Sequence, residues 1–214
     1  MGISDRKDRE KRERRERILK AAEKLFRTKG YDATSMADIA EEVELSPATL
    51  YLYFPNKEVL HAAASLTITK SLLEGIENHG ESDEGPEDTL EAIREMLSQY
   101  FETHKSVLLN VFRFQSSPLI HNLSPELSDF IKEITAPTLR SLSRTFETGM
   151  EQGRYKRRNP VAVADVFWGV FIGLVIWEES KRALDPKKNH MKETLALAFE
   201  LLSEGLKQKD ETTE

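Results

Sequence analysis

Residues 34–54, TSMADIAEEVELSPATLYLYF, decide the fold of this chain. The first half predicts a short helix over 35–43, because apolar residues recur three and four positions apart, and Thr34 is the expected N-cap. Ser46 and the proline that follows it predict the start of a second short helix over 47–54. Two short helices joined by a tight turn predict a helix-turn-helix.

The apolar spacing is helical along the rest of the chain as well. Gly30 is expected to end the helix before the helix-turn-helix, and Asn56 is expected to cap the helix after it. Because no useful stretch alternates apolar and polar residues, the predicted fold class is all-α. The helices expected after residue 56 cover 57–77, 89–103, 105–115, 125–149, 160–183 and 190–207, and a polar loop rich in Gly and Pro covers 78–88.

The composition is that of a soluble globular chain. Of its 214 residues 39% are hydrophobic and 32% are charged, and the absence of cysteine excludes disulfides, thiol nucleophiles and cysteine-ligated metals. The net charge is −6, yet residues 1–30 hold 12 Lys/Arg against 6 Asp/Glu, whereas residues 61–214 hold 18 against 25. A local basic patch favours nucleic-acid binding, and the alternating charges between Asp5 and Arg17 are equally typical of a solvated helix. The start lacks the apolar segment of a secretory signal, so we expect a cytoplasmic protein.

Residues 161–177, VAVADVFWGVFIGLVIW, form the most apolar stretch. It is shorter than the roughly 20 residues that a membrane-spanning helix needs, and it contains Asp165. Gly169 and Gly173 are four residues apart, so they lie on one helix face and permit close approach of another helix. We therefore expect a core and subunit-interface helix and no membrane anchor.

The second short helix carries side chains suited to a DNA groove. Ser46 and Thr49 can donate to base edges or phosphates, and Tyr51 and Tyr53 can donate to phosphate oxygens. Ala48 is small enough to permit contact with a thymine methyl group. Spacing and capping by themselves leave two interpretations open, a DNA-binding motif and an ordinary helical hairpin in a bundle.

Residues 15–60 resemble the N-terminal DNA-binding domain of the TetR family of repressors. The matching positions are Ile18, Leu19, Ala21, Ala22, Leu25, Phe26, Gly30, Tyr31, Thr34, Ser35, Met36, Ile39, Ala40, Val43, Leu50, Tyr51, Tyr53, Phe54, Lys57 and Glu58. The resemblance implies an N-terminal three-helix DNA-binding domain over 1–56. It also implies a larger helical domain over 57–214 that binds a small effector and forms a homodimer.

The resemblance also implies which residues meet DNA. Ser35, Met36 and Ala37 would begin the supporting helix near the groove edge, and Lys57 would hold the phosphate backbone. The recognition helix would be lined by Ser46, Pro47, Ala48, Thr49, Tyr51, Leu52 and Tyr53. Pro47 and Leu52 offer no hydrogen-bond donor, and glycine is more usual where Ala48 stands. We therefore expect sparse direct readout and more weight on phosphate contacts and DNA shape.

For the C-terminal part, the resemblance implies that the last two long helices form a four-helix dimer interface. The expected interface residues are Gly169, Gly173, Leu195 and Leu202. Most aromatic residues are expected in the core, and a subset is expected to line an apolar effector cavity with a few polar anchors. The expected pocket residues are Tyr100, His104, Arg113, Phe114, His121, Trp168 and Phe171.

Catalytic motifs are absent from the sequence. The five histidines are scattered, with no metal-ligand pair at helical spacing, and there is no nucleophile elbow, phosphate-binding loop or dinucleotide-binding glycine pattern. We predict a non-enzymatic repressor without cofactor or metal, whose partners are operator DNA, a second copy of itself and a small apolar effector. The alternative is a helical adaptor protein, which explains the bundle and the charge but not a recognition helix with outward Thr and Tyr.

Overall fold

The computed structural model describes residues 3–80 and 85–208, and within these ranges the regular elements are helical. They are α1 (Ile3–Lys29), α2 (Met36–Glu42), α3 (Pro47–Tyr53), α4 (Lys57–Gly80), α5 (Pro86–Gln115), the short 3-10 helix η1 (Pro118–Asn122), α6 (Pro125–Glu151), α7 (Pro160–Leu184) and α8 (Met191–Leu206). The predicted all-α fold class is confirmed.

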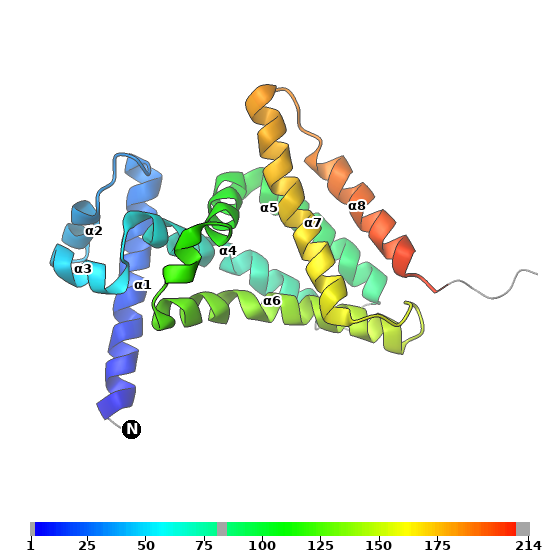
Figure 1. Cartoon of the computed structure of the whole chain (residues 1–214), viewed down its shortest axis with the longest axis horizontal. Coiled ribbons are helices and arrows are strands. Elements are labelled where there is room, and N and C mark those ends of the chain that lie inside the picture. The colour runs from blue at the N-terminus through cyan, green and yellow to red at the C-terminus, as the bar shows by residue number, and fades with distance from the viewer. Residues whose placement is uncertain (1–2, 81–84, 209–214) are drawn as a thin grey trace, which may run out of the picture. The chain divides into compact units, whose positions relative to one another are not determined.

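The helices divide into two compact units (Figure 1). Unit 1 comprises residues 1–68 and 113–131, and unit 2 comprises residues 69–112 and 132–214. Helix α4 begins in unit 1 and ends in unit 2, so the compact units do not follow simple blocks of sequence. The domain boundary expected after residue 56 separates a DNA-binding part from an effector-binding part, and it stays a prediction.

Unit 1 packs around the apolar face of α1. Ile18, Ala22 and Leu25 of this helix lie in a buried cluster with Ile39 of α2 and Leu50 of α3. Each large side chain that is fully buried in this way stabilises the fold by about 1.5–3 kcal/mol. The cluster therefore holds the two short helices, neither of which is long enough to be stable alone in water.

Unit 2 has an aromatic core. The rings of Phe146 and Phe167 have centroids 4.8 Å apart, and Phe167 meets Phe199 of α8 edge to face at 5.1 Å. Phe112 of α5 packs edge to face on Phe171 of α7 at 6.0 Å. These contacts join α5, α6, α7 and α8, and they place most of the C-terminal aromatic residues in the core, as expected.

Two helix boundaries differ from the sequence prediction. Helix α4 continues to Gly80 and α5 begins at Pro86, so the expected polar loop over 78–88 is too long. Helix α5 begins earlier than expected because proline suits the first position of a helix, where no backbone N–H is needed. The expected break between 103 and 105 is confirmed, because His104 leaves the helical region with φ −130° and ψ 29° inside α5.

Helix α7 begins and ends as its sequence predicts. Asn159 caps it, and its side-chain oxygen accepts hydrogen bonds from the backbone N–H groups of Val161 at 3.0 Å and Ala162 at 3.3 Å. By length and composition alone α7 could cross a membrane, since its apolar window has a mean hydropathy of 2.0. Only 22% of that window is buried. Unit 2 therefore leaves much of its most apolar helix uncovered.

Candidate nucleic-acid interface

Helices α2 and α3 form the helix-turn-helix that the sequence predicts. Glu44 lies in the turn between them with φ +56°, a left-handed conformation that costs an L-residue about 1–2 kcal/mol. The next residue, Leu45, donates its N–H to the carbonyl of Ala40 at 2.8 Å, which closes the end of α2. The chain thus reverses direction in a few residues and starts α3 at a defined angle.

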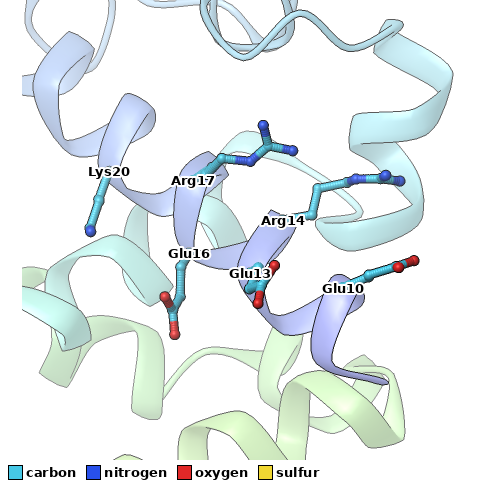
Figure 2. Close-up of a pocket in the computed structure, with 6 residues that line it drawn as sticks. All are labelled: Glu10, Glu13, Arg14, Glu16, Arg17 and Lys20. Atoms are coloured by element: carbon cyan, nitrogen blue, oxygen red, sulfur yellow. The ribbon is translucent and has the colours of Figure 1, made fainter. Parts of the chain in front are cut away.

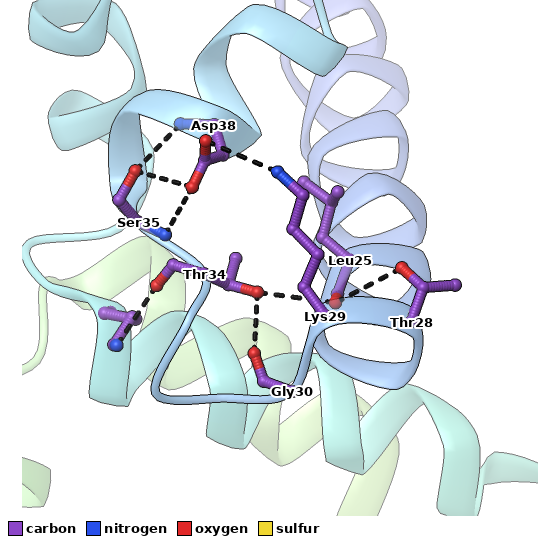
Figure 3. Close-up of polar contacts among 8 residues, drawn as sticks. Leu25, Thr28, Lys29, Gly30, Thr34, Ser35 and Asp38 are labelled. Carbon is purple, nitrogen blue, oxygen red and sulfur yellow. Dashed lines mark hydrogen bonds and ion pairs between the residues drawn. The ribbon is translucent and has the colours of Figure 1, made fainter.

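The N-cap of α2 is Ser35, and the expectation of Thr34 in this role is wrong. The Ser35 hydroxyl accepts the N–H of Asp38 at 3.1 Å, and the Asp38 carboxylate accepts the N–H of Ser35 at 2.8 Å (Figure 3). This reciprocal pair is a capping box. The hydrogen bonds from the Ser35 backbone and hydroxyl lower the pKa of Asp38.

The sequence pattern does not indicate the role that Thr34 has instead. Its buried hydroxyl donates to the carbonyl of Gly30 at 2.7 Å and lies 3.3 Å from the carbonyl of Leu25 (Figure 3). Gly30 has φ +84°, a conformation that glycine adopts without steric cost. Thr34 therefore satisfies carbonyls at the end of α1 and leaves the capping of α2 to its neighbour.

The start of α3 is capped by Ser46, as predicted. The Ser46 hydroxyl accepts the backbone N–H of Thr49 at 3.2 Å, and the two hydroxyl oxygens are 2.8 Å apart. Both hydroxyls that the sequence analysis assigned to base or phosphate contacts are thus already bonded to each other. The cap consequently holds α3 in place and leaves these two hydroxyl groups with less hydrogen-bonding capacity for DNA.

The expected DNA-contacting residues differ in how much they are exposed. The exposed ones are Ser35, Ala37, Ser46, Pro47, Ala48, Tyr51 and Leu52, and the half-buried ones are Thr49, Tyr53 and Lys57. Met36 is only 8% exposed and belongs to the buried cluster of unit 1. Tyr53 packs against the same cluster. Met36 therefore lies on the inward face of α2, where the apolar spacing predicts it, and its expected position near the groove edge stays a prediction.

Lys57 is held by the protein itself. Its ammonium donates to the carbonyls of Tyr31 at 2.9 Å and Thr34 at 3.1 Å, and it lies 4.2 Å from the centre of the Tyr31 ring. These contacts tie the start of α4 to the loop before α2. An ammonium group has three donors, so a phosphate contact by Lys57 remains chemically open and stays a prediction.

The middle of α1 carries acidic and basic side chains next to each other. A shallow hollow on this helix is lined by three acidic and three basic residues, Glu10, Glu13, Arg14, Glu16, Arg17 and Lys20 (Figure 2). Arg6 and Glu10, four residues apart, form an ion pair at 2.8 Å nearer the start of the helix. Such mixed charge is typical of a solvated helix, although residues 1–30 as a whole hold 12 Lys/Arg against 6 Asp/Glu.

The expected effector-pocket residues fall into both units. In unit 2, Tyr100 stacks on His104 at 4.4 Å, and Trp168 lies 5.7 Å from Phe171. Burial raises the pKa of Tyr100 to about 12. Phe114 belongs to the core cluster of unit 1, and Arg113 and His121 are exposed on that unit. A shared pocket for all seven residues stays a prediction.

The expected dimer residues divide between surface and core. Gly169 and Gly173 are exposed with open space around them, whereas Leu195 is fully buried and Leu202 is half-buried. Leu195 therefore packs inside unit 2. Other exposed apolar side chains are Val166 and Trp177 on α7, and Leu197 and Leu201 on α8. On α7, residues 166, 169, 173 and 177 share one face by helical spacing.

Comparisons with known proteins agree with this geometry. Residues 18–64 match the family described as bacterial regulatory proteins, tetR family. Two Bacillus subtilis relatives, the uncharacterized HTH-type transcriptional regulators YhgD and YvkB, are 29% and 30% identical to this chain. The YhgD alignment covers 86% of this chain and 91% of the relative, and the YvkB alignment covers 75% and 80%.

A solved structure has a similar fold over most of the chain. Thermus thermophilus FadR, described as a TetR family transcriptional repressor in complex with lauroyl-CoA, has a TM-score of 0.72 and 21% sequence identity. The similarity covers 94% of this chain and 98% of FadR. The likeness therefore extends from the helix-turn-helix through both compact units.

Proposed function

This chain belongs to the TetR family of bacterial regulatory proteins, and from this premise we propose that it is a homodimeric repressor that a small apolar effector releases from its operator. It is a transcriptional regulator, like its relatives. Residues 1–56 act as the DNA-binding domain, and residues 57–214 bind the effector and form the dimer. Neither task involves catalysis, and the protein acts in the cytoplasm.

The exposed side of α3 is the observation that carries the DNA-binding role. Pro47, Ala48, Tyr51 and Leu52 face solvent on a helix that the Ser46 cap and the buried Leu50 fix from behind. A recognition helix needs such a rigid support, because base contacts require a defined register in the major groove. In a dimer, two copies of α3 would enter half-sites about 34–36 Å apart or a multiple of that distance.

The uncovered face of α7 supports the homodimer. Gly169 and Gly173 allow close approach, and Trp177, which is 60% exposed, lies on the same face. Two copies of α7 and α8 would pack these faces against each other in a four-helix interface. That arrangement removes apolar surface from water, which is the dominant favourable contribution to association, and it needs no membrane.

The effector would bind in unit 2. Tyr100 and His104 form one aromatic pair and Trp168 and Phe171 form another, and aromatic surface with a few polar groups is the usual lining of a small-molecule site. Release from DNA requires that the effector bind one arrangement of the DNA-binding domains more tightly than another. The Trp177→Phe variant leaves Trp168 as the sole tryptophan. A change in its fluorescence when an apolar compound is added therefore indicates that the compound binds near Trp168.

A DNA titration tests the proposal. Purified full-length protein is titrated against DNA that flanks its own coding region and against random DNA of the same length, at several salt concentrations. We expect selective binding that is about 10³-fold or more tighter on the flanking DNA, with a bounded salt slope. Equal, weak binding to both DNAs that follows salt alone would contradict the proposal and favour the helical adaptor.

A further inference from the structure

We propose that α3 discriminates between DNA sequences mainly through the 5-methyl groups of thymine, which Leu52 and Ala48 contact. This inference rests on the proposed DNA-binding function and specifies what the recognition helix reads. It makes Leu52 a specificity-determining residue, although leucine has no hydrogen-bonding group. The surface is the exposed side of α3, defined by Pro47, Ala48, Tyr51 and Leu52.

The residue types that usually recognise purines are missing from α3. The helix reads PATLYLY and contains no Arg, Lys, Asn or Gln. Bidentate recognition of guanine depends on Arg or Lys, and that of adenine depends on Asn or Gln. Recognition by α3 must therefore rely on hydroxyl groups or on apolar contacts.

Most hydroxyl groups near α3 are already engaged or turned inward. Ser46 is the N-cap and accepts the backbone N–H of Thr49, and the two hydroxyl oxygens are 2.8 Å apart. Tyr53 is half-buried against the core of unit 1. Only Tyr51 presents a phenol on the exposed side, where its side chain is 50% exposed. A single phenol can fix a phosphate or one base edge, but it cannot specify a site of several base pairs.

The remaining exposed groups on α3 are apolar. Leu52 is 83% exposed, although it lies only two residues from Leu50, which is fully buried. Ala48 and Leu52 are four residues apart and therefore adjacent on one helix face. In the major groove the thymine methyl group is the apolar feature that distinguishes one base pair from another, and apolar side-chain groups contact it. An exposed leucine beside an exposed alanine matches that feature.

Binding to uracil-substituted DNA tests the inference directly. The operator is first selected from a random double-stranded library with the full-length protein, and each thymidine in the selected site is then replaced by deoxyuridine. Where Leu52 or Ala48 contacts a methyl group, we expect the replacement to raise the dissociation constant about fourfold. This factor corresponds to the free energy of burying one methyl-sized group. At the base that Leu52 contacts, the Leu52→Ala variant should bind the thymidine and deoxyuridine DNAs with dissociation constants that differ by no more than about twofold.

Two controls separate readout from other effects. Tyr51→Phe removes only the phenol oxygen, so it should weaken binding equally on both DNAs and preserve the preference for thymidine. Thermal unfolding of Leu52→Ala should match that of the parent protein, because the side chain is exposed.

The outcomes distinguish this inference from the function on which it rests. If no sequence is enriched, both the inference and the proposed function are overturned. If a site is enriched but deoxyuridine leaves its affinity unchanged, the inference falls and the regulator stands. If Leu52→Ala retains the full loss on deoxyuridine, DNA shape or another residue reads the site, and the role of Leu52 is overturned.

Discussion

Helices α3 and α7 both expose apolar side chains, but they differ in how much of the helix the protein itself covers. In α3, the inner residue Leu50 is fully buried while Leu52 is 83% exposed. In α7, Phe171 and Val175 are fully buried while Trp177 is 60% exposed. Each helix therefore has an inner face that holds it in its unit and an outer face that is left for a partner.

The difference between the two outer faces indicates different partners. The outer face of α3 is two turns long and has a phenol beside its apolar groups, which suits the polar-walled major groove of DNA. The outer face of α7 extends along a 25-residue helix and contains two glycines, which suits a second helix at close range. Exposure alone does not identify a partner, but length and neighbouring residue types do.

The largest expected effect concerns the inner face of α3. Leu50→Ala should lower the free energy of unfolding of unit 1 by about 2–5 kcal/mol, because it leaves a cavity in a closely packed core. Urea unfolding followed by circular dichroism measures this change. Leu52→Ala is the matched control, and it should stay within about 0.5 kcal/mol of the parent protein. Equal effects of the two variants would show that α3 has no distinct inner and outer faces.

The next effect concerns the outer face of α7. Trp177→Ala should raise the dissociation constant of the homodimer at least about tenfold, since tryptophan is a frequent hot spot at the centre of interfaces. Sedimentation velocity over a range of protein concentrations measures it. Leu52→Ala, which also removes an exposed apolar group, should leave the mass distribution unchanged. If Trp177→Ala sediments like the parent protein, this face is not the dimer interface.

A smaller effect is expected from a buried carboxylate that joins α7 to α8. Burial disfavours ionisation of Glu178, but hydrogen bonds from Lys181 at 2.6 Å and from the backbone N–H of His190 at 3.0 Å hold its pKa below the ordinary value. A lowered pKa contributes stability that is present above the ordinary value near 4.5 and is lost as pH falls through the lowered value.

Glu178→Gln should therefore cost about 1–2 kcal/mol near neutral pH, with a smaller cost in acid. The unfolding free energy, measured by urea titration from pH 7 to pH 3, should fall less steeply in the variant than in the parent protein. If the unfolding free energies of the two proteins change in parallel with pH, Glu178 has no lowered pKa. Its side chain would then contribute to stability through packing alone.

The smallest effect concerns the cap that orients α3. Ser46→Ala removes the acceptor for the N–H of Thr49 and should cost about 1 kcal/mol in unfolding free energy. Ser46→Asn keeps a side-chain acceptor and should remain close to the parent protein. Differential scanning calorimetry can resolve both. Equal melting temperatures for Ser46→Ala and Ser46→Asn would mean that the buried Leu50, and not the cap, fixes the start of α3.

The local chemistry of the helix-turn-helix was largely predictable. Ser46, Asn56 and Asn159 cap the helices that their side chains were expected to cap. Gly30 follows the end of α1 with the positive φ that the position requires. These signals are local, because a cap or a helix stop involves residues within one turn of each other. The wrong N-cap of α2 is also a local error, because the adjacent Thr34 and Ser35 both have a hydroxyl group that could cap the helix.

Contacts between distant segments were not predictable. Lys57 donates to carbonyls 26 and 23 residues earlier, and no local pattern indicates that contact. Among the expected pocket residues, Phe114 lies in the core of unit 1 while Trp168 and Phe171 lie in unit 2. Apolar residues at helical spacing show that a helix has an inner face, but not which other helices cover it.

The sequence by itself determined the helical fold, the two short helices and most of their caps, because hydrogen bonds and apolar periodicity within a helix depend on neighbouring residues. Only the tertiary structure decided which helices cover each inner face. Leu195 was expected at the dimer interface together with Gly169 and Gly173, yet Leu195 is fully buried while the two glycines are exposed. This difference arises from the packing of α8 within unit 2, which brings together residues far apart in the chain.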